Sequence, residues 1–174
     1  MKQLDFPTLR QTYGYDCGAA ALQTILAYYG LNIRGELIIK LAKTNKKKGT
    51  SISGMLYVLK KYNLQFDAKK MSMATLKNYL NKKIPVILLL QAWNGKPIDY
   101  TSDFKDGHWV VLVGYDKQKF IFEDPYVFEH TFLTEQELKK RWHSEQNGKK
   151  IFNYGIAVYG KEPVYNSKKI IHLD

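Results

Sequence analysis

The sequence contains a single cysteine, Cys17, within the stretch "QTYGYDCGAAAL". A helical pattern starts directly after it, because Leu22, Ile25 and Leu26 recur at helical spacing. The start of a helix offers unpaired N–H groups and the positive end of the helix dipole, and both favour an anion such as a thiolate. A lone intracellular cysteine is more often a small buried residue. The small residues that follow, 18–21, suit close helix packing as well as a bound substrate. The function of Cys17 therefore depends on its partners.

An imidazole is the partner that a thiolate needs for acyl transfer, because it holds the proton and later delivers it to the leaving group. Of the four histidines, His130, His143 and His172 lie in polar, lysine-rich or tail segments. His108 differs, because it opens the apolar run "HWVVLVGYD" after a long loop. A histidine at the start of a strand can also be a simple polar cap. His108 is the candidate general base, provided that a third group orients it.

Asp124, at the end of the next run "FIFEDP", is the candidate carboxylate that orients the imidazole. If "DKQ" forms a three-residue hairpin loop, Asp124 faces Val110, which shares a face of the sheet with His108. Such diagonal neighbours lie about 7–8 Å apart, within reach of their side chains. An even-numbered loop would put the two residues on opposite faces unless a bulge intervened. The triad hypothesis therefore predicts an odd register or a β-bulge.

An oxyanion that forms when a thiolate attacks a carbonyl needs hydrogen-bond donors. Gln11, six positions before Cys17, is the candidate side-chain donor, together with the backbone N–H of Cys17. Three aromatic residues, Trp93, Tyr100 and Trp109, fall at or near the ends of the strands beside the predicted site. We expect them to line a substrate cleft, with buried aromatic packing as the alternative for at least one of them.

The elements that must position these residues form two groups along the chain. Helical patterns cover about 18–29, 34–42, a segment from near Ser53, and 72–80, with the short strand "LQFDA" between the last two. Strand patterns then follow in "IPVILLLQAW", "HWVVLVGYD", "KFIFED" and "NYGIAVYG", interrupted by the helix "TEQELKKRW" with capping-box spacing. Helices in the first half and strands in the second predict an α+β fold with an antiparallel sheet.

The composition fits one domain spanning residues 1–174, with 45% hydrophobic residues. A single cysteine excludes an internal disulfide and any multi-cysteine metal site, and the sequence implies no metal and no organic cofactor. The net charge of +11 comes from lysines in polar segments rather than along one helical face. This distribution favours a solvated surface over a nucleic-acid groove. Without a signal peptide or a run of about 18 apolar residues, we expect a cytoplasmic protein with no integral membrane segment.

The ordered motifs "QTYGYDCGAAAL", "GTSISGMLYVLKKYNL", "IPVILLLQAW", "GHWVVLVGYD" and "FIFEDP" resemble the C39 family of papain-like cysteine peptidases. The similarity extends over about residues 11–142. It implies a papain-like fold in which Cys17 is the nucleophile, His108 the general base and acid, Asp124 the orienting residue and Gln11 the oxyanion-hole donor. The family includes the leader-peptide peptidase domains of bacteriocin-exporting ABC transporters. It therefore implies a peptide or protein substrate, bacteriocin processing on glycine-containing leaders, and association with a separate ABC transporter.

Two features of the chain depart from the transporter-linked members. Those proteins often carry a second cysteine shortly after the nucleophile, where this chain has alanine, and the chain lacks a P-loop motif. The long segment Asn94–Gly107 is more similar to the stand-alone C39-like proteins. Two alternatives remain beside peptide hydrolysis: a peptide-binding module of the same fold that does not cleave, and a thiol acyltransferase that uses the same residues.

Overall fold

The computed structural model describes residues 1–173, in which helices and strands alternate in a mixed order. The helices are α1 (Cys17–Tyr28), α2 (Gly35–Ala42), α3 (Ile52–Lys61), α4 (Met73–Asn81) and α5 (Glu135–Arg141). The strands are β1 (Lys2–Gln3), β2 (Gln65–Lys70), β3 (Val86–Gln91), β4 (Gly107–Tyr115), β5 (Lys119–Glu123), β6 (Thr131–Thr134), β7 (His143–Gln146), β8 (Lys149–Phe152) and β9 (Tyr154–Tyr159). The predicted α+β class with an antiparallel sheet is confirmed.

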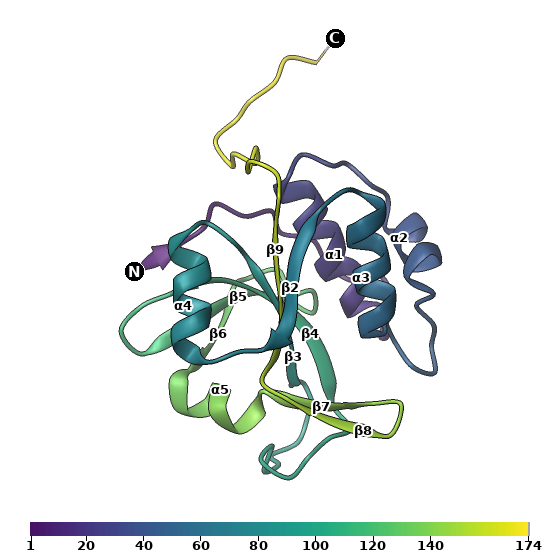
Figure 1. The fold of residues 1–174 in the computed structure, drawn as a ribbon, viewed down its shortest axis with the longest axis vertical. Helices are drawn as coiled ribbons and strands as arrows, with labels where there is room; N and C mark the ends of the chain where they lie inside the picture. The colour runs from purple at the N-terminus through teal and green to yellow at the C-terminus, as the bar shows by residue number, and fades with distance from the viewer. Residues whose placement is uncertain (174) are drawn as a thin grey trace.

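The main sheet has the strand order β2-β9-β3-β4-β5-β6, and every pairing in it is antiparallel. Figure 1 shows α1, α2 and α3 grouped on one side of this sheet, with α4 and α5 on the other. The central strands β3 and β4 are buried on both faces, which explains why their sequences are continuous apolar runs. No helix among residues 1–173 is both long and apolar enough to cross a membrane.

The helix ends follow the local sequence signals. Ser51 caps α3 by accepting a hydrogen bond from the backbone of Gly54, and Ser72 caps α4 in the same way. Thr134 and Glu137 form the predicted capping box at the start of α5. Gly30, just after α1, has a φ of 79°, a left-handed conformation that glycine adopts without strain. The predicted helix boundaries are therefore confirmed to within one or two residues.

The hairpin of β4 and β5 contains the bulge that the triad hypothesis required as one of its two options. Near the turn, Tyr115 pairs with Phe120 and Gly114 with Ile121, a register in which paired residue numbers sum to 235. Beyond the shift between Leu112 and Gly114, the pairs sum to 234, as in Leu112 with Phe122. Continued by one position, this register places Asp124 opposite Val110, on the same face as His108. The shift of one residue at the bulge therefore puts Asp124 on the face of His108, because the register near the turn, if continued, would place it opposite Val111.

Strand β6 and the hairpin of β7 and β8 are missing from the sequence-based prediction. The hairpin "HSEQNGKKIF" is polar, so it lacks the apolar runs by which the other strands are recognised. Its turn residues Asn147 and Gly148 both have positive φ angles, 52° and 75°. The Asn-Gly pair is the strongest short-range signal for such a turn, and it could have revealed the hairpin. This hairpin matters for function because it forms one wall of the cleft described below.

Candidate active site

His108 and Asp124 form a buried hydrogen-bonded pair. The His108 Nε2 atom lies 2.7 Å from Asp124 Oδ1, and the two residues are only 7% and 3% exposed. β5 pairs with β4 as far as Val111 and Glu123, so the His108 end of β4 extends past β5. Asp124 follows β5 directly and turns toward that end of β4. The two residues that the sequence analysis coupled are thus brought together by the hairpin and its bulge.

The Asp124 carboxylate accepts three further hydrogen bonds. The backbone N–H of Tyr126 donates to Oδ1 at 3.0 Å, while the indole N–H of Trp93 at 3.1 Å and the hydroxyl of Thr131 at 3.3 Å donate to Oδ2. Burial raises the pKa of Asp124, but the interaction with His108 and these donors outweigh burial and lower it overall. Asp124 is therefore a fixed anion whose orientation is determined by four partners.

Cys17, the first residue of α1, lies next to the same imidazole. Burial lowers the pKa of His108, but hydrogen bonds from its ring to Asp124 and to the Cys17 side chain outweigh burial and raise the pKa to about 9. Because Asp124 occupies Nε2, the nitrogen that remains for the sulfur is Nδ1. Cys17 is only half-buried, so its sulfur is accessible from the cleft. The ring therefore connects the thiol to the carboxylate and carries a proton at neutral pH.

Gln11 is tied to the segment that carries Asp124. Its backbone N–H donates to the carbonyl of Pro125 at 2.9 Å. The preceding residues are also anchored, because the Thr8 hydroxyl and the Leu9 backbone N–H both donate to the buried carboxylate of Glu123 at 3.1 Å. The side-chain Nε2 of Gln11 donates to the carbonyl of Tyr13 at 2.7 Å, and its Oε1 is buried without a partner among residues 1–173. An amide nitrogen carries two N–H groups, so one of them remains for a substrate oxygen.

Asp16 shapes the turn between Gln11 and Cys17. Its carboxylate accepts hydrogen bonds from the backbone N–H groups of Thr12 at 3.2 Å and Tyr13 at 2.8 Å, and it is 3% exposed. Asp16 is the N-cap of α1, yet its side chain caps no N–H of that helix. The first N–H groups of α1, beginning with that of Cys17, are therefore left for another acceptor. This is the position at which an oxyanion would lie.

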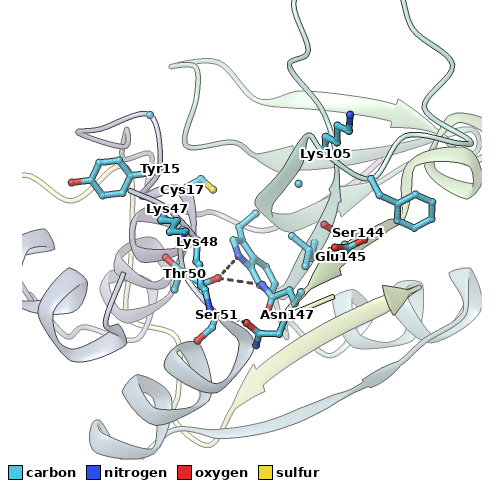
Figure 2. A pocket seen from close by; sticks show the side chains of 17 residues that line it. Tyr15, Cys17, Lys47, Lys48, Thr50, Ser51, Lys105, Ser144, Glu145 and Asn147 are labelled. Atoms are coloured by element: carbon cyan, nitrogen blue, oxygen red, sulfur yellow. Dashed lines mark hydrogen bonds between the residues drawn. The ribbon is translucent and has the colours of Figure 1, made fainter. Parts of the chain in front are cut away.

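A cleft of about 430 Å³ starts at Cys17. Figure 2 shows Tyr15, Cys17 and the residues Lys47 to Ser51 on one side of it, with Ser144 and Glu145 on the other. Trp109 lines this cleft as predicted, but it is only 2% exposed, and its indole N–H donates to the carbonyl of Thr50 at 3.0 Å. Trp109 thus forms part of the floor of the cleft rather than an exposed binding surface.

Trp93 and Tyr100 lie elsewhere than expected. Both line a second cavity of about 820 Å³, which also borders Asp124 and Val110. Leu90 and Val110 line this cavity, whereas their neighbours Leu89 and Trp109 line the Cys17 cleft. Successive residues of a strand point to opposite faces, so the two cavities lie on opposite faces of the sheet. The structure therefore places Trp93 and Tyr100 beside the carboxylate and away from the thiol.

Trp93 connects several parts of the site in a way that the sequence did not indicate. Besides its hydrogen bond to Asp124, its ring packs on that of Tyr126 with centroids 4.7 Å apart. Tyr126 in turn presents its ring edgewise to His108, with centroids 6.5 Å apart. Trp93 has a φ of 62°, a strained conformation for a bulky residue. The surrounding contacts therefore hold Trp93 in place against a backbone cost.

The loop between β3 and β4 is ordered by buried polar contacts. The Gln91 side chain accepts from the backbone N–H of Asp106 at 2.9 Å and donates to the carbonyl of His143 at 3.1 Å. Asn94 donates to the Asp106 carboxylate, and the His143 ring donates through Nε2 to the carbonyl of Tyr100 at 2.8 Å. The loop that the sequence analysis noted for its length is therefore fastened to β7. Among residues 1–173, no group of three or more His, Cys, Asp or Glu residues is placed to hold a metal ion.

Comparison with known proteins identifies a matching family and solved structures with the same fold. The profile of the peptidase C39 family matches residues 5–146. The peptidase domain of Streptococcus ComA, a bifunctional ABC transporter involved in quorum sensing, superposes with a TM-score of 0.68 at 22% identity, covering 92% of this chain and 100% of that chain. No curated protein matches the sequence significantly.

Two further structures share the fold. A double-glycine-motif protease from an AMS/PCAT transporter, solved with its leader peptide, has a TM-score of 0.66 at 18% identity and covers 93% and 94% of the two chains. A protein from Bacillus anthracis described as a C39-like peptidase has a TM-score of 0.68 at 18% identity and covers 93% and 98%. At such identities these likenesses concern the fold, which is papain-like as the resemblance implied.

Proposed function

The chain belongs to the peptidase C39 family, and on that premise we propose that it is a cysteine peptidase whose catalytic residues are Cys17, His108 and Asp124. The observation that carries the proposal is the position of the His108 ring, which hydrogen-bonds the Asp124 carboxylate and lies close enough to Cys17 for that side chain to raise the pKa of His108. The imidazole is therefore placed to hold the proton of the Cys17 thiol and later to give it to the leaving amine.

In the first step, the Cys17 sulfur attacks the carbonyl carbon of the scissile amide, and the carbonyl oxygen becomes an oxyanion. The backbone N–H of Cys17 and the free N–H of the Gln11 amide are the donors we assign to that oxygen. The C–N bond then breaks as the His108 imidazolium gives its proton to the leaving amine. The product is a thioester between Cys17 and the amino-terminal part of the substrate.

In the second step, the now neutral His108 takes a proton from water, and the resulting hydroxide attacks the thioester. The carboxylic acid product leaves, and the sulfur and the imidazole return to their starting charges. Throughout, Asp124 accepts the Nε2 hydrogen and keeps Nδ1 directed at the reacting atoms. If an acceptor amine replaced water in this step, the same residues would carry out acyl transfer.

For the substrate, we propose a peptide or protein with glycine near the scissile bond, as in a double-glycine leader, and a separate ABC transporter as partner. The proposal is supported by the family and by two similar structures, one described as the peptidase domain of an ABC transporter and one as a protease from an AMS/PCAT transporter, solved with the leader peptide. Within the cleft, Ser144 packs closely on Gly107, where a Cβ atom would lie 2.6 Å from the Ser144 hydroxyl.

Alkylation kinetics test the proposed nucleophile. We expect iodoacetamide to modify Cys17 at pH 7 at least about tenfold faster than it modifies free cysteine, and the His108→Ala variant to lose that advantage. Equal rates for the two proteins would contradict the thiolate mechanism. Fast alkylation with no cleavage of any leader-like peptide would instead favour the peptide-binding module.

A second variant tests the oxyanion donor separately. Gln11→Ala should lower kcat by roughly 10²–10³ while the alkylation rate remains unchanged, because alkylation forms no oxyanion. A parallel fall in both rates would show that Gln11 acts on the conformation of the Cys17 segment instead.

A further inference from the structure

The cleft at Cys17 carries an excess of positive charge. Lys47 and Lys48 line it from the turn between α2 and α3, and Lys105 lines it from the loop that precedes β4. Glu145 is the only carboxylate among the lining residues. Figure 2 shows Lys47 and Lys48 on the Cys17 side of the cleft and Lys105 across from them, above Ser144 and Glu145. The lysines thus face the cleft from two opposite walls.

These three lysines keep their charge uncompensated. None of them forms an ion pair with a carboxylate within the described part of the chain. The ammonium of Lys48 donates to the Asn147 side-chain oxygen at 3.4 Å, a contact that spans the cleft but neutralises nothing. A bound anionic group would therefore meet attraction from several directions.

The chemistry of the site indicates which part of a substrate fills this cleft. The leaving amine must lie within reach of His108, which donates its proton. The cleft is lined by Cys17 but not by His108, so it lies on the side of the sulfur that faces away from the leaving group. The acyl part of the substrate, on the amino-terminal side of the scissile bond, is the part that can occupy it.

We infer that the substrate carries an aspartate or glutamate within a few residues on the amino-terminal side of the scissile bond, recognised by Lys47, Lys48 and Lys105. This inference rests on the proposed function. It adds a charge requirement to the glycines of the proposed substrate. The preference is electrostatic, so it weakens as ionic strength rises.

A pair of alkylating agents that differ in charge tests the inference at Cys17 itself. Iodoacetate and iodoacetamide both lose iodide as the sulfur forms the new S–C bond, but only iodoacetate is an anion. We expect the iodoacetate to iodoacetamide rate ratio in the wild type to be about tenfold higher than in the triple variant Lys47→Gln/Lys48→Gln/Lys105→Gln. The difference should shrink at about 1 M salt. Because both reagents react with the same sulfur, the ratio cancels any change in the reactivity of Cys17 itself, and continued reaction with iodoacetamide shows that the site is folded.

The matched control is Lys61→Gln/Lys82→Gln/Lys161→Gln, which removes three exposed lysines that do not line the cleft. It lowers the net charge by the same amount, and its rate ratio should stay within twofold of the wild type. A ratio that is equal in the wild type and in the cleft variant overturns the inference. So does a control variant that loses as much selectivity as the cleft variant, because the effect would then come from net charge alone.

Peptide substrates extend the test. Coumarin amides of acetyl-Glu-Ala-Gly-Gly and acetyl-Gln-Ala-Gly-Gly differ only in one charge, and we expect a five- to tenfold higher kcat/KM for the glutamate peptide. The cleft variant should remove that difference. Slow iodoacetamide reaction of Cys17 in the wild type would contradict the proposed peptidase, whereas fast reaction without charge selectivity would overturn only the inference about acidic substrates.

Discussion

The two ends of the candidate triad lie on opposite faces of the sheet and are built differently. On the Asp124 side, four donors fix one carboxylate, and the neighbouring cavity has mostly apolar walls. On the Cys17 side, the cleft is polar, Gln11 Oε1 is buried without a partner within residues 1–173, and the first N–H groups of α1 are uncapped by a side chain. The Asp124 carboxylate thus has four donors, whereas the Cys17 end leaves an acceptor, Gln11 Oε1, and the first N–H donors of α1 unused by the described side chains.

This difference separates orientation from reactivity. A group that must hold one direction gains from many partners, and their loss costs stability. A group that must meet a changing substrate has to leave its hydrogen bonds unmade until the transition state. Variants at the Cys17 end should therefore affect turnover more than folding, and variants at the Asp124 end should affect both.

The largest difference between the effect on activity and the effect on stability is expected for Cys17→Ala. Cleavage of a leader-like peptide should fall by more than about 10⁴-fold, because no other group in the site can form the thioester. The free energy of unfolding should change by less than about 1 kcal/mol, since the side chain is small and half-buried. Peptide-cleavage kinetics measure the first effect, and urea denaturation of the same two proteins measures the second. A variant that keeps a tenth of the activity would disprove the role of Cys17.

Asp124→Asn should affect both properties. The amide replaces an oxygen that accepts hydrogen bonds with a group that cannot, so kcat should fall by roughly 10²–10⁴ and the unfolding free energy by about 2–3 kcal/mol. Asp116→Asn is a suitable control, because that exposed carboxylate also accepts backbone N–H groups, from Gln118 and Lys119, but lies at the hairpin turn. If Asp124→Asn and Asp116→Asn unfold at the same urea concentration, the hydrogen bonds of Asp124 contribute no more to stability than those of an ordinary turn carboxylate.

The pH dependence of stability tests the role of His108, which links Asp124 to Cys17. The pKa of His108 is raised from 6.5 to about 9 in the folded protein, so protonated His108 stabilises the fold by up to about 3 kcal/mol. That contribution is complete below pH 6.5 and is lost as the pH rises through about 9. Urea unfolding between pH 6 and 9.5 should show this decline, and His108→Gln should flatten it. An unchanged slope in the variant would assign the decline to other groups.

The smallest effect is expected for Trp93→Phe. Phenylalanine keeps an aromatic ring against Tyr126 but removes the indole N–H that binds Asp124 Oδ2. Three other donors remain, so kcat should fall only about three- to tenfold, with KM unchanged. A shift of the pH–rate profile would accompany the fall if the bond orients the triad. A loss as large as that of Asp124→Asn would mean that this single bond, and not the whole network, fixes the carboxylate.

The sequence predicted the parts of this arrangement that follow from strand alternation. His108 and Asp124 could be coupled because their facing positions depend on register alone, and the bulge is one of the two solutions that the alternation allowed. The apolar runs of β3 and β4 and the caps at Ser51, Ser72 and Thr134 were also readable, because each depends on nearby residues.

The remaining contacts depend on distant segments that no local pattern specifies. Trp93 reaches Asp124 from a loop residue in a left-handed conformation that sequence rules assign to glycine or asparagine. Glu123 is a charged residue at a strand end, yet it is 1% exposed because Thr8 and Leu9 cross over it. The wall formed by β7 and the turn to β8 was missed because its residues are polar, and with it the charged cleft was missed.

The extra residue in β4 at Val113 has a consequence for how this protein can change length over evolution. Because the shift between Leu112 and Gly114 resets the alternation, the turn at 116–118 is out of phase with the part of the hairpin that holds His108 and Asp124. Inserting two residues at the turn would only lengthen the hairpin tip. Deleting Val113 would keep Leu112 paired with Phe122 and Val111 with Glu123, so Asp124 would still lie opposite Val110. The bulge therefore uncouples the hairpin tip from the site, so the tip can change in length without moving His108 relative to Asp124.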